Sequence, residues 1–439
     1  VEKNGSAMLE ERMQVLAGEG ENVTVFNTLG FDRSDVVRLP GSVQGALEDE
    51  DGKIYPVQEL GDASVVYLTD LPSKGQKSYR IREGAPLASP FQRDGNCLET
   101  PYYRVELDEN GLFTSLFDKA NDREIVQEGK KANLFRMYED KPMHYNNWDI
   151  DIYYSEKFWD VTEATKIQWT MEGAVCAVLE IERPVSRSLI RQKICFYRDT
   201  PRIDFETYVD WKDCQHLLKV HFPVDIHTDE ASFDVQFGNL TRKVHTNTSW
   251  DRARFESCGQ KWMDLSEGHY GVSLLNDCKY GHSVKDSDIA LTLIKSGNEP
   301  NPVADQEEHW FTYSLYPHKG NLRECDTVRE SYCLNFPALT ALHTAMGETA
   351  SLLSVDQKNV MAETVKPAED GNGVILRVYE YENARTKAAI TFGMGHKIAS
   401  VQECNLMEEP EGGLLEHTEE SFAFVIKPYE IKTYRVVFQ

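Results

Sequence analysis

The side chains most suited to chemistry gather in one short stretch of the sequence. Residues 143–149, MHYNNWD, bring aromatic, amide and acidic groups together between predicted strands. Aromatic rings cover the apolar C–H face of a sugar, Asn and Asp bond its hydroxyls, and loops on a rigid sheet often carry such groups. We predict that His144, Trp148, Asp149 and Asp151 edge a sugar-binding pocket. The alternative is a structural loop in which Trp148 is a buried anchor and the Asp side chains cap turns.

Asp149 and Asp151 also have the spacing of a carboxylate pair. On a strand, residues i and i+2 point to one face, about 6–7 Å apart, and retaining glycoside hydrolysis uses two carboxyl groups about 5–5.5 Å apart. The chain holds 72 acidic residues, however, so such pairs arise by chance. We therefore predict no catalysis by this pair alone, and no catalytic residue in the chain.

A second candidate group lies in the tight turn that spans residues 276–281. Lys279 could donate to a sugar hydroxyl, Tyr280 could stack or donate, and Asp277 could accept. The alternative, which the Asn and Gly of the segment favour, is a turn that satisfies backbone geometry. Residues 317–320, PHKG, are predicted to form another turn, after the large β-block.

The histidines do not have the spacing of metal ligands. His216, His221 and His227 are five and six residues apart, which fits no zinc motif. On a continuous strand His216 and His221 fall on opposite faces. We predict no metal and no cofactor on this chain. Phosphate-binding glycine loops and the nucleophile motif G-x-S-x-G are also absent from the sequence.

Composition excludes several classes of partner. Lys and Arg number 47 against 72 Asp and Glu, a net charge of −25, which repels nucleic acid and anionic membranes. No apolar run is long enough to span a bilayer, and no secretory signal opens the chain. The nine cysteines are odd in number, scattered and without a C-x-x-C pair. This pattern predicts free thiols and a reducing, cytoplasmic location.

Periodicity predicts a mainly β, antiparallel architecture in several parts. A helix is expected at residues 6–18, with Ser6 as its cap, an apolar stripe of Met8, Leu9, Met13 and Leu16, and Gly18 at its end. Alternating strands follow, for example Asp35–Leu39, Tyr103–Leu107, Leu189–Tyr197, Arg202–Asp210 and Ser421–Ile426. We predict a helical tail at 1–20, a small β-domain at 21–86, a linker over 84–95, a large sandwich at 95–325 and a C-terminal sandwich at 326–439.

Several segments resemble the C-terminal half of glycoside hydrolase family 38 α-mannosidases, particularly the cytosolic type. The most specific is residues 255–281, FESCGQKWMDLSEGHYGVSLLNDCKYG. Residues 23–40, 148–154, 313–320, 376–382 and 428–434 also follow the family pattern, in the family's order. One departure is visible, because the family's usual His before Lys/Arg-Trp is Gln260 here.

The resemblance implies a fold and a division of labour. The large part is expected to be a super-sandwich of the galactose mutarotase type, flanked by two smaller β-domains. Family members retain anomeric configuration with two carboxylates and a zinc ion on an N-terminal barrel, and none of those motifs occurs here. The implied substrate is terminal α-linked mannose. The chain is expected to be the non-catalytic half that meets the missing catalytic domain, completes the pocket rim and helps oligomerisation.

Two other functions stay open on the sequence alone. An aldose epimerase would need a His general base and a facing carboxylate on the concave sheet, and His221 could supply the base. A carbohydrate-binding or assembly module would need no chemistry at all.

Overall fold

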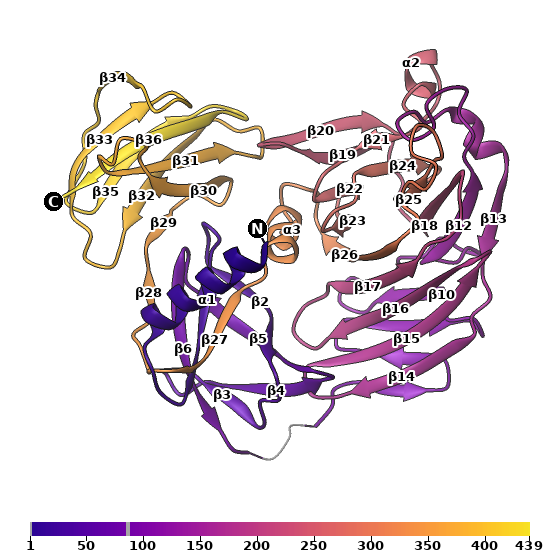
Figure 1. The fold of residues 1–439 in the computed structure, drawn as a ribbon, viewed down its shortest axis with the longest axis horizontal. Helices are drawn as coiled ribbons and strands as arrows, with labels where there is room; N and C mark the ends of the chain where they lie inside the picture. The colour runs from indigo at the N-terminus through magenta and orange to yellow at the C-terminus, as the bar shows by residue number, and fades with distance from the viewer. Residues whose placement is uncertain (1, 85–87) are drawn as a thin grey trace. The chain divides into compact units, whose positions relative to one another are not determined.

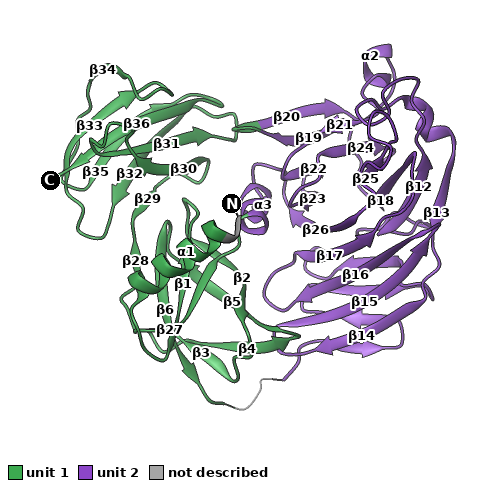
Figure 2. Ribbon diagram, viewed as in Figure 1, with its two compact units in different colours: residues 1–87, 236–238, 336–439 green, residues 88–235, 239–335 purple. Residues whose placement is uncertain are grey.

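The computed structural model describes residues 2–84 and 88–439. Within them the chain forms two compact units (Figures 1 and 2). The first contains residues of the ranges 2–84, 236–238 and 336–439, and the second contains 88–235 and 239–335. The predicted class, mainly antiparallel β with a C-terminal sandwich, is confirmed.

The first unit holds three sheets. One has the order β2 (Arg33–Pro40), β5 (Ala63–Leu71), β4 (Ile54–Leu60), β3 (Ala46–Glu48), β6 (Gly75–Arg82), β1 (Asn22–Asn27) and β27 (Leu339–Thr344), and β28 (Ala350–Ser351) also pairs with β6. A three-stranded sheet has the order β29 (Leu353–Val355), β32 (Thr386–Phe392) and β35 (Ser421–Ile426). A five-stranded sheet completes the C-terminal sandwich, with the order β30 (Val360–Pro367), β31 (Val374–Glu380), β36 (Ile431–Phe438), β33 (Ile398–Cys404) and β34 (Pro410–Leu414).

The second unit is built on two large sheets and a small one. The nine-stranded sheet has the order β14 (Lys166–Glu172), β15 (Cys176–Val185), β16 (Ser188–Tyr197), β17 (Ile203–Asp210), β26 (Glu308–Lys319), β23 (Tyr270–Asn276), β22 (Trp262–Ser266), β19 (Glu230–Val235) and β20 (Gly238–Lys243). The six-stranded sheet has the order β13 (Phe158–Val161), β12 (Leu134–Glu139), β18 (His216–Pro223), β25 (Asp288–Ser296), β24 (Gly281–Lys285) and β21 (Ser257–Cys258). The small sheet has the order β11 (Arg123–Glu124), β10 (Phe113–Asp118), β9 (Tyr103–Leu107), β8 (Cys97–Glu99) and β7 (Gln92–Asp94).

Side-chain alternation explains how the second unit forms its core. In β17 the side chains of Ile203, Phe205 and Val209 are buried in one large apolar cluster, as their spacing predicts. Phe205 stacks on Tyr313 of the neighbouring β26, with ring centroids 5.0 Å apart. The same cluster takes residues from the six-stranded sheet, so the core lies between the two large sheets.

The helices of the described residues are few and short. They are α1 (Glu2–Ala17), α2 (Ser249–Arg252), α3 (Thr327–Asn335) and the 3-10 turn η1 (Ile152–Glu156). None of them is both long and apolar enough to cross a membrane.

The prediction for the first helix is correct at its end and wrong at its start. Gly18 has a φ of +68° and its N–H donates to the carbonyl of Gln14, which closes the helix. Ser6 lies inside α1 and is not its cap, because the helix already begins at Glu2. Of the predicted stripe only Met13 is buried, and Met8, Leu9 and Leu16 are exposed.

Two predicted boundaries differ from the observed sheets. The predicted linker over 84–95 has three residues, 85–87, outside the described part, and its end forms β7, which pairs with β8. The predicted boundary at 325/326 assigns α3 and β27 to the C-terminal sandwich. Instead α3 packs on β22 and β23, and β27 extends the first sheet beside β1. Sheet membership depends on non-local pairing, which the local pattern does not encode.

Candidate functional site

The loop of residues 143–151 is fastened by one buried amide. Asn146 is 5% exposed, and its Oδ1 accepts from the backbone N–H groups of Asn298 (2.8 Å) and Glu299 (2.9 Å). Its Nδ2 donates to Asn298 Oδ1 (2.7 Å). Lys295 donates to the carbonyl of Asn146 and, at 2.6 Å, to the buried carboxylate of Asp140. The loop is therefore tied to the segment that follows β25.

Around this anchor the loop presents aromatic side chains to solvent. Trp148 is 69% exposed, and its ring centroid lies 5.7 Å from that of the exposed Tyr145. The ring centroid of His144 lies 6.4 Å from that of Tyr145. The predicted alternative of a buried tryptophan anchor is wrong, because Trp148 is exposed and the buried residue that anchors the loop is Asn146.

The two acidic residues of the loop have different surroundings. Asp151 Oδ2 accepts from the N–H of Met143 at 2.8 Å, so this carboxylate closes the loop on itself. Asp149 is exposed, and its N–H donates to the carbonyl of Tyr145. Neither residue is in a strand, since η1 begins at Ile152, so the i and i+2 geometry of a strand does not apply to them.

The second candidate group forms a turn with satisfied polar atoms. Asp277 Oδ2 accepts from the N–H of Thr312 at 2.9 Å. The N–H of Lys279 donates to Asn276 Oδ1, and the Lys279 ammonium lies 4.4 Å from the ring centroid of Phe311. Tyr280 is 58% exposed. These contacts are those expected of a structural turn, with Tyr280 as its exposed side chain.

Beneath the loop, η1 closes the outer face of the six-stranded sheet. Tyr154 of η1 is 7% exposed and donates to Glu256 Oε1 at 2.8 Å. Glu256 also pairs with Lys219, which is 0% exposed and donates to Ser283 Oγ at 2.7 Å. No pattern in the sequence predicts this network. Glu256 lies in the segment that carries the family resemblance, but its separation of 37 positions from Lys219 follows no period.

His221 lies on the same face of β18 and has both ring nitrogens engaged. Nδ1 is 2.9 Å from Asp288 Oδ2, and Nε2 is 2.9 Å from the Tyr138 hydroxyl. Burial lowers its pKa, against the effect of Asp288. A general base needs an open nitrogen within reach of its substrate, so this geometry does not favour the epimerase alternative.

The other two histidines considered as metal ligands, His216 and His227, do not come together in a metal site among the described residues either. Within residues 2–84 and 88–439, no three His, Cys, Asp or Glu side chains are arranged to hold a metal ion. The described residues therefore do not fit a zinc site. Five of the cysteines, Cys97, Cys214, Cys258, Cys278 and Cys404, are free thiols.

The predicted turn at 317–320 is wrong, and its histidine is buried. His318 lies in β26, a twelve-residue strand whose residues 313–319 pair with β23. Its Nε2 is 2.8 Å from Asp264 Oδ2, and both side chains are almost fully buried. Burial lowers the pKa of His318, but the hydrogen bonds to Asp264 and Cys325, together with the charges of these two groups, outweigh burial and raise that pKa to about 10. The pair is an internal ion pair.

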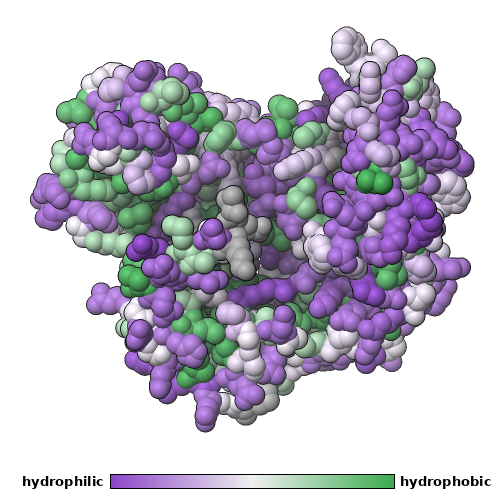
Figure 3. Space-filling model, in the orientation of Figure 1, coloured by the Kyte–Doolittle hydropathy of each residue, from purple (hydrophilic) through white to green (hydrophobic). Residues whose placement is uncertain are grey.

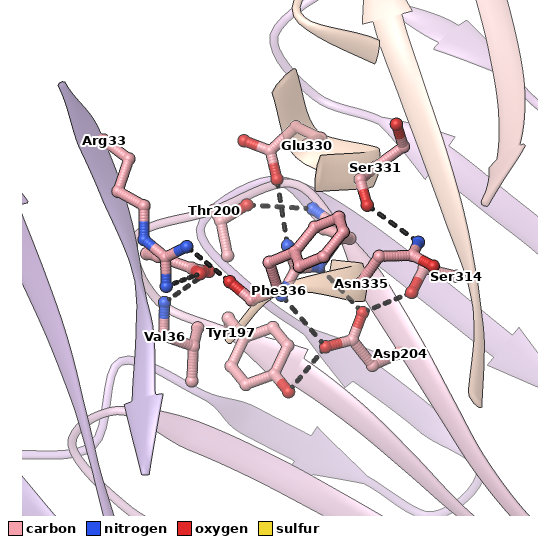
Figure 4. Close-up of polar contacts among 12 residues, drawn as sticks. Arg33, Val36, Tyr197, Thr200, Asp204, Ser314, Glu330, Ser331, Asn335 and Phe336 are labelled. Carbon is pink, nitrogen blue, oxygen red and sulfur yellow. Dashed lines mark hydrogen bonds and ion pairs between the residues drawn. The ribbon is translucent and has the colours of Figure 1, made fainter. Parts of the chain in front are cut away.

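A second buried ion pair joins α3 to the nine-stranded sheet. Arg202 donates to Asp204 Oδ1 at 2.9 Å and to Glu330 of α3 at 3.1 Å. Figure 4 shows the hydroxyls of Tyr197 and Ser314 pointing at the Asp204 carboxylate. In the first unit, Arg33 donates to the carbonyl of Phe336 at 2.7 Å. The Asp204 carboxylate accepts from Arg202 and from both hydroxyls, which is typical of a structural contact.

Comparison with sequence families finds two matches, over separate ranges. Residues 98–303 match the model described as "Glycosyl hydrolases family 38 C-terminal domain". Residues 359–434 match "Glycosyl hydrolases family 38 C-terminal beta sandwich domain".

Relatives and solved structures agree with these matches. Alpha-mannosidase 2C1 of Homo sapiens is 33% identical over 460 residues, which cover 100% of this chain and 42% of the human protein. Alpha-mannosidase G of Dictyostelium discoideum is 31% identical, over 95% of this chain and 40% of that protein. An alpha-mannosidase structure from Enterococcus faecalis superimposes with a TM-score of 0.75 at 17% identity, over 97% of this chain and 58% of that one. The chain spans less than half the length of the two relatives.

Proposed function

The chain belongs to glycosyl hydrolase family 38, and from this premise we propose that it is the non-catalytic C-terminal part of an α-mannosidase. Two relatives that align over nearly the whole chain are named alpha-mannosidases, and the alignment takes 42% and 40% of their lengths. The substrate of the longer protein is terminal α-linked mannose. Its natural location is the cytoplasm, which the five free thiols support.

The chemistry belongs to the rest of that longer protein. Retention of configuration takes two carboxylates flanking the scissile bond, and in this proposal both, together with a zinc ion, are held outside this chain. Two observations support this division. The Asp151 carboxylate closes its own loop, and the described residues contain no three-residue metal cluster.

This chain contributes part of the pocket rim and a rigid support for the catalytic domain. The observation that carries the rim proposal is the exposed aromatic loop fixed by the buried Asn146. A rigid loop lowers the entropic cost of holding a sugar, since its side chains are already in place. Trp148 is the side chain best suited to cover a sugar's C–H face. Helping oligomerisation stays part of the proposal.

A side-by-side assay tests the division of chemistry. A nitrophenyl α-mannoside is offered to the purified 439-residue chain and to the longer polypeptide that contains the catalytic domain. We expect hydrolysis by the longer polypeptide alone, and no zinc in the shorter chain after chelator treatment. Mannose release by the 439-residue chain with kinetics near those of the longer one would refute the proposal, as would stoichiometric zinc.

A substitution in the longer polypeptide tests the rim. Trp148→Ala should lower kcat/KM about fivefold, because an aromatic contact with a sugar is worth about 1 kcal/mol. The control is Trp250→Ala, since Trp250 is 77% exposed on the short helix α2. Equal kcat/KM for wild type and Trp148→Ala, with both folded, would remove Trp148 from the rim.

A further inference from the structure

A separate groove opens at the edge of the six-stranded sheet, beside β13. It has a volume of about 450 Å³, which is within the range of small-molecule sites, about 300–1,000 Å³. Its floor is apolar, because Met137, Val161 and Val185 are all buried there. Its wall includes Trp159, which is 46% exposed. None of these residues belongs to the loop of residues 143–151.

Buried charged groups fix both walls of this groove. On one side Asp213, which is 2% exposed, accepts from the hydroxyls of Ser186 and Ser188 at 2.7 and 2.6 Å and holds the β15–β16 turn. On the other side Arg183, which is 1% exposed, donates to the carbonyl of Thr162 at 2.6 Å. Side chains locked by such contacts give a preformed site.

The rim of the groove offers mainly hydrogen-bond acceptors and hydroxyls. Glu163 and Ser186 are exposed there, beside Thr162. His216 Nδ1 lies 2.7 Å from the carbonyl of Cys214, so Nδ1 carries the proton and Nε2 is the acceptor of the neutral ring. No Lys or Arg is among the residues that line the groove, so an anionic ligand has no partner in it.

The surroundings of Trp159 also disfavour a cation. The ammonium of Lys157 already lies 5.4 Å from the Trp159 ring centroid, where a cationic ligand would bind. Asp160 is neutralised by Arg136 at 2.6 Å. What remains is an apolar floor, a partly exposed indole and a ring of acceptors, which suits a neutral ligand with one apolar face and several hydroxyls.

We propose that this groove is a second, non-catalytic binding site for a neutral saccharide, with Trp159 as its stacking platform. The site stands on the cavity and its contacts, and it does not depend on the proposed rim loop or on the mannosidase assignment.

Ligand-observed NMR and calorimetry on the 439-residue chain test the site. The probes are the methyl glycosides of mannose, glucose and galactose, with tetramethylammonium as the cation probe. We expect at least one glycoside to bind and the cation not to bind. Failure of all three glycosides to bind, or binding of the cation alone, would overturn the proposal.

Substitutions locate the bound sugar. Trp159→Ala should raise Kd about tenfold, Trp159→Phe should raise it less because a ring is kept, and Glu163→Gln should raise it several-fold. Trp250→Ala is the matched control, because Trp250 is exposed and does not line the groove. Circular dichroism checks that each variant is folded. Sugar binding that is lost in Trp148→Ala and kept in Trp159→Ala would place the ligand on the rim loop and overturn the proposal.

Discussion

Replacing Asn146 by Ala should release the aromatic loop while the sandwich stays folded. The side chain makes three hydrogen bonds, to the N–H groups of Asn298 and Glu299 and to Asn298 Oδ1. Each is worth about 0.5–1.5 kcal/mol, so the substitution should cost about 3 kcal/mol. Both N–H groups belong to the segment after β25, and the large core lies elsewhere. The cost should therefore appear as local opening.

Hydrogen exchange measures this opening directly. A loss of about 3 kcal/mol corresponds to about a hundredfold faster exchange at the amides of Asn298 and Glu299. Asn146→Asp is the informative second variant, because its carboxylate keeps the acceptor of both N–H bonds. The Asn298 amide can also turn to donate to it. This variant should speed exchange by no more than about tenfold, a cost of about 1 kcal/mol.

The control for this experiment is Asn372→Ala, an exposed asparagine of the first unit. It should leave exchange at Asn298 and Glu299 unchanged. If Asn146→Ala also leaves those amides protected at the wild-type level, Asn146 is not the anchor of the loop. The loop is then not held rigid by this side chain, and the proposed rim is not preformed.

Three further outcomes follow from the buried and exposed groups of the second unit. Because the pKa of His318 rises from 6.5 to about 10 in the folded chain, its pair with Asp264 should stabilise the fold fully below pH 6.5 and lose that effect as pH rises through 10. The free energy of unfolding, measured with denaturant across this pH range, should show this decline, and its dependence on pH should be weaker in His318→Gln. An unchanged pH dependence in that variant would exclude His318 as the source. Glu256→Gln should lower the free energy of unfolding by about 3–5 kcal/mol, because it leaves the Lys219 ammonium buried without its carboxylate. Adding Lys219→Met should recover much of that loss. Equal stability of the single and double variants would contradict this prediction. Trp148→Ala should change unfolding free energy by less than about 0.5 kcal/mol, since the ring is 69% exposed, and a larger loss in the same experiment would show that the ring packs against the fold.

The strands could be predicted from the sequence because one face of each is buried. In β17 the apolar residues Ile203, Phe205 and Val209 alternate with polar ones, and β9 and β35 begin and end at the predicted residues. The helix α3 was missed although its pattern was present, since Val328, Ser331 and Tyr332 have helical spacing and are all buried. Because α3 is short and has strands on both sides, its helical pattern was not distinguished from the strand patterns around it.

The partners of the candidate site could not be predicted in the same way. The seven residues 143–149 were identified from their chemistry, but nothing local shows that Asn146 is the buried member and Trp148 the exposed one. That outcome depends on Lys295 and Asn298, about 150 residues later in the chain. Hydrogen-bond partners that are brought together by sheet pairing leave no periodic trace, whereas burial on one face of a strand does.

The fold uses one segment for two purposes, and this explains why an exposed aromatic loop can be rigid. At its start Asn146 ties the loop to the segment after β25, and at its end Tyr154 of η1 is buried on Glu256. Tyr154 also covers the face of β18 that carries Lys219, whose ammonium lies 5.5 Å from the tyrosine ring centroid. The same two attachments hold Trp148 at a fixed place between them, which is what the proposed pocket rim requires.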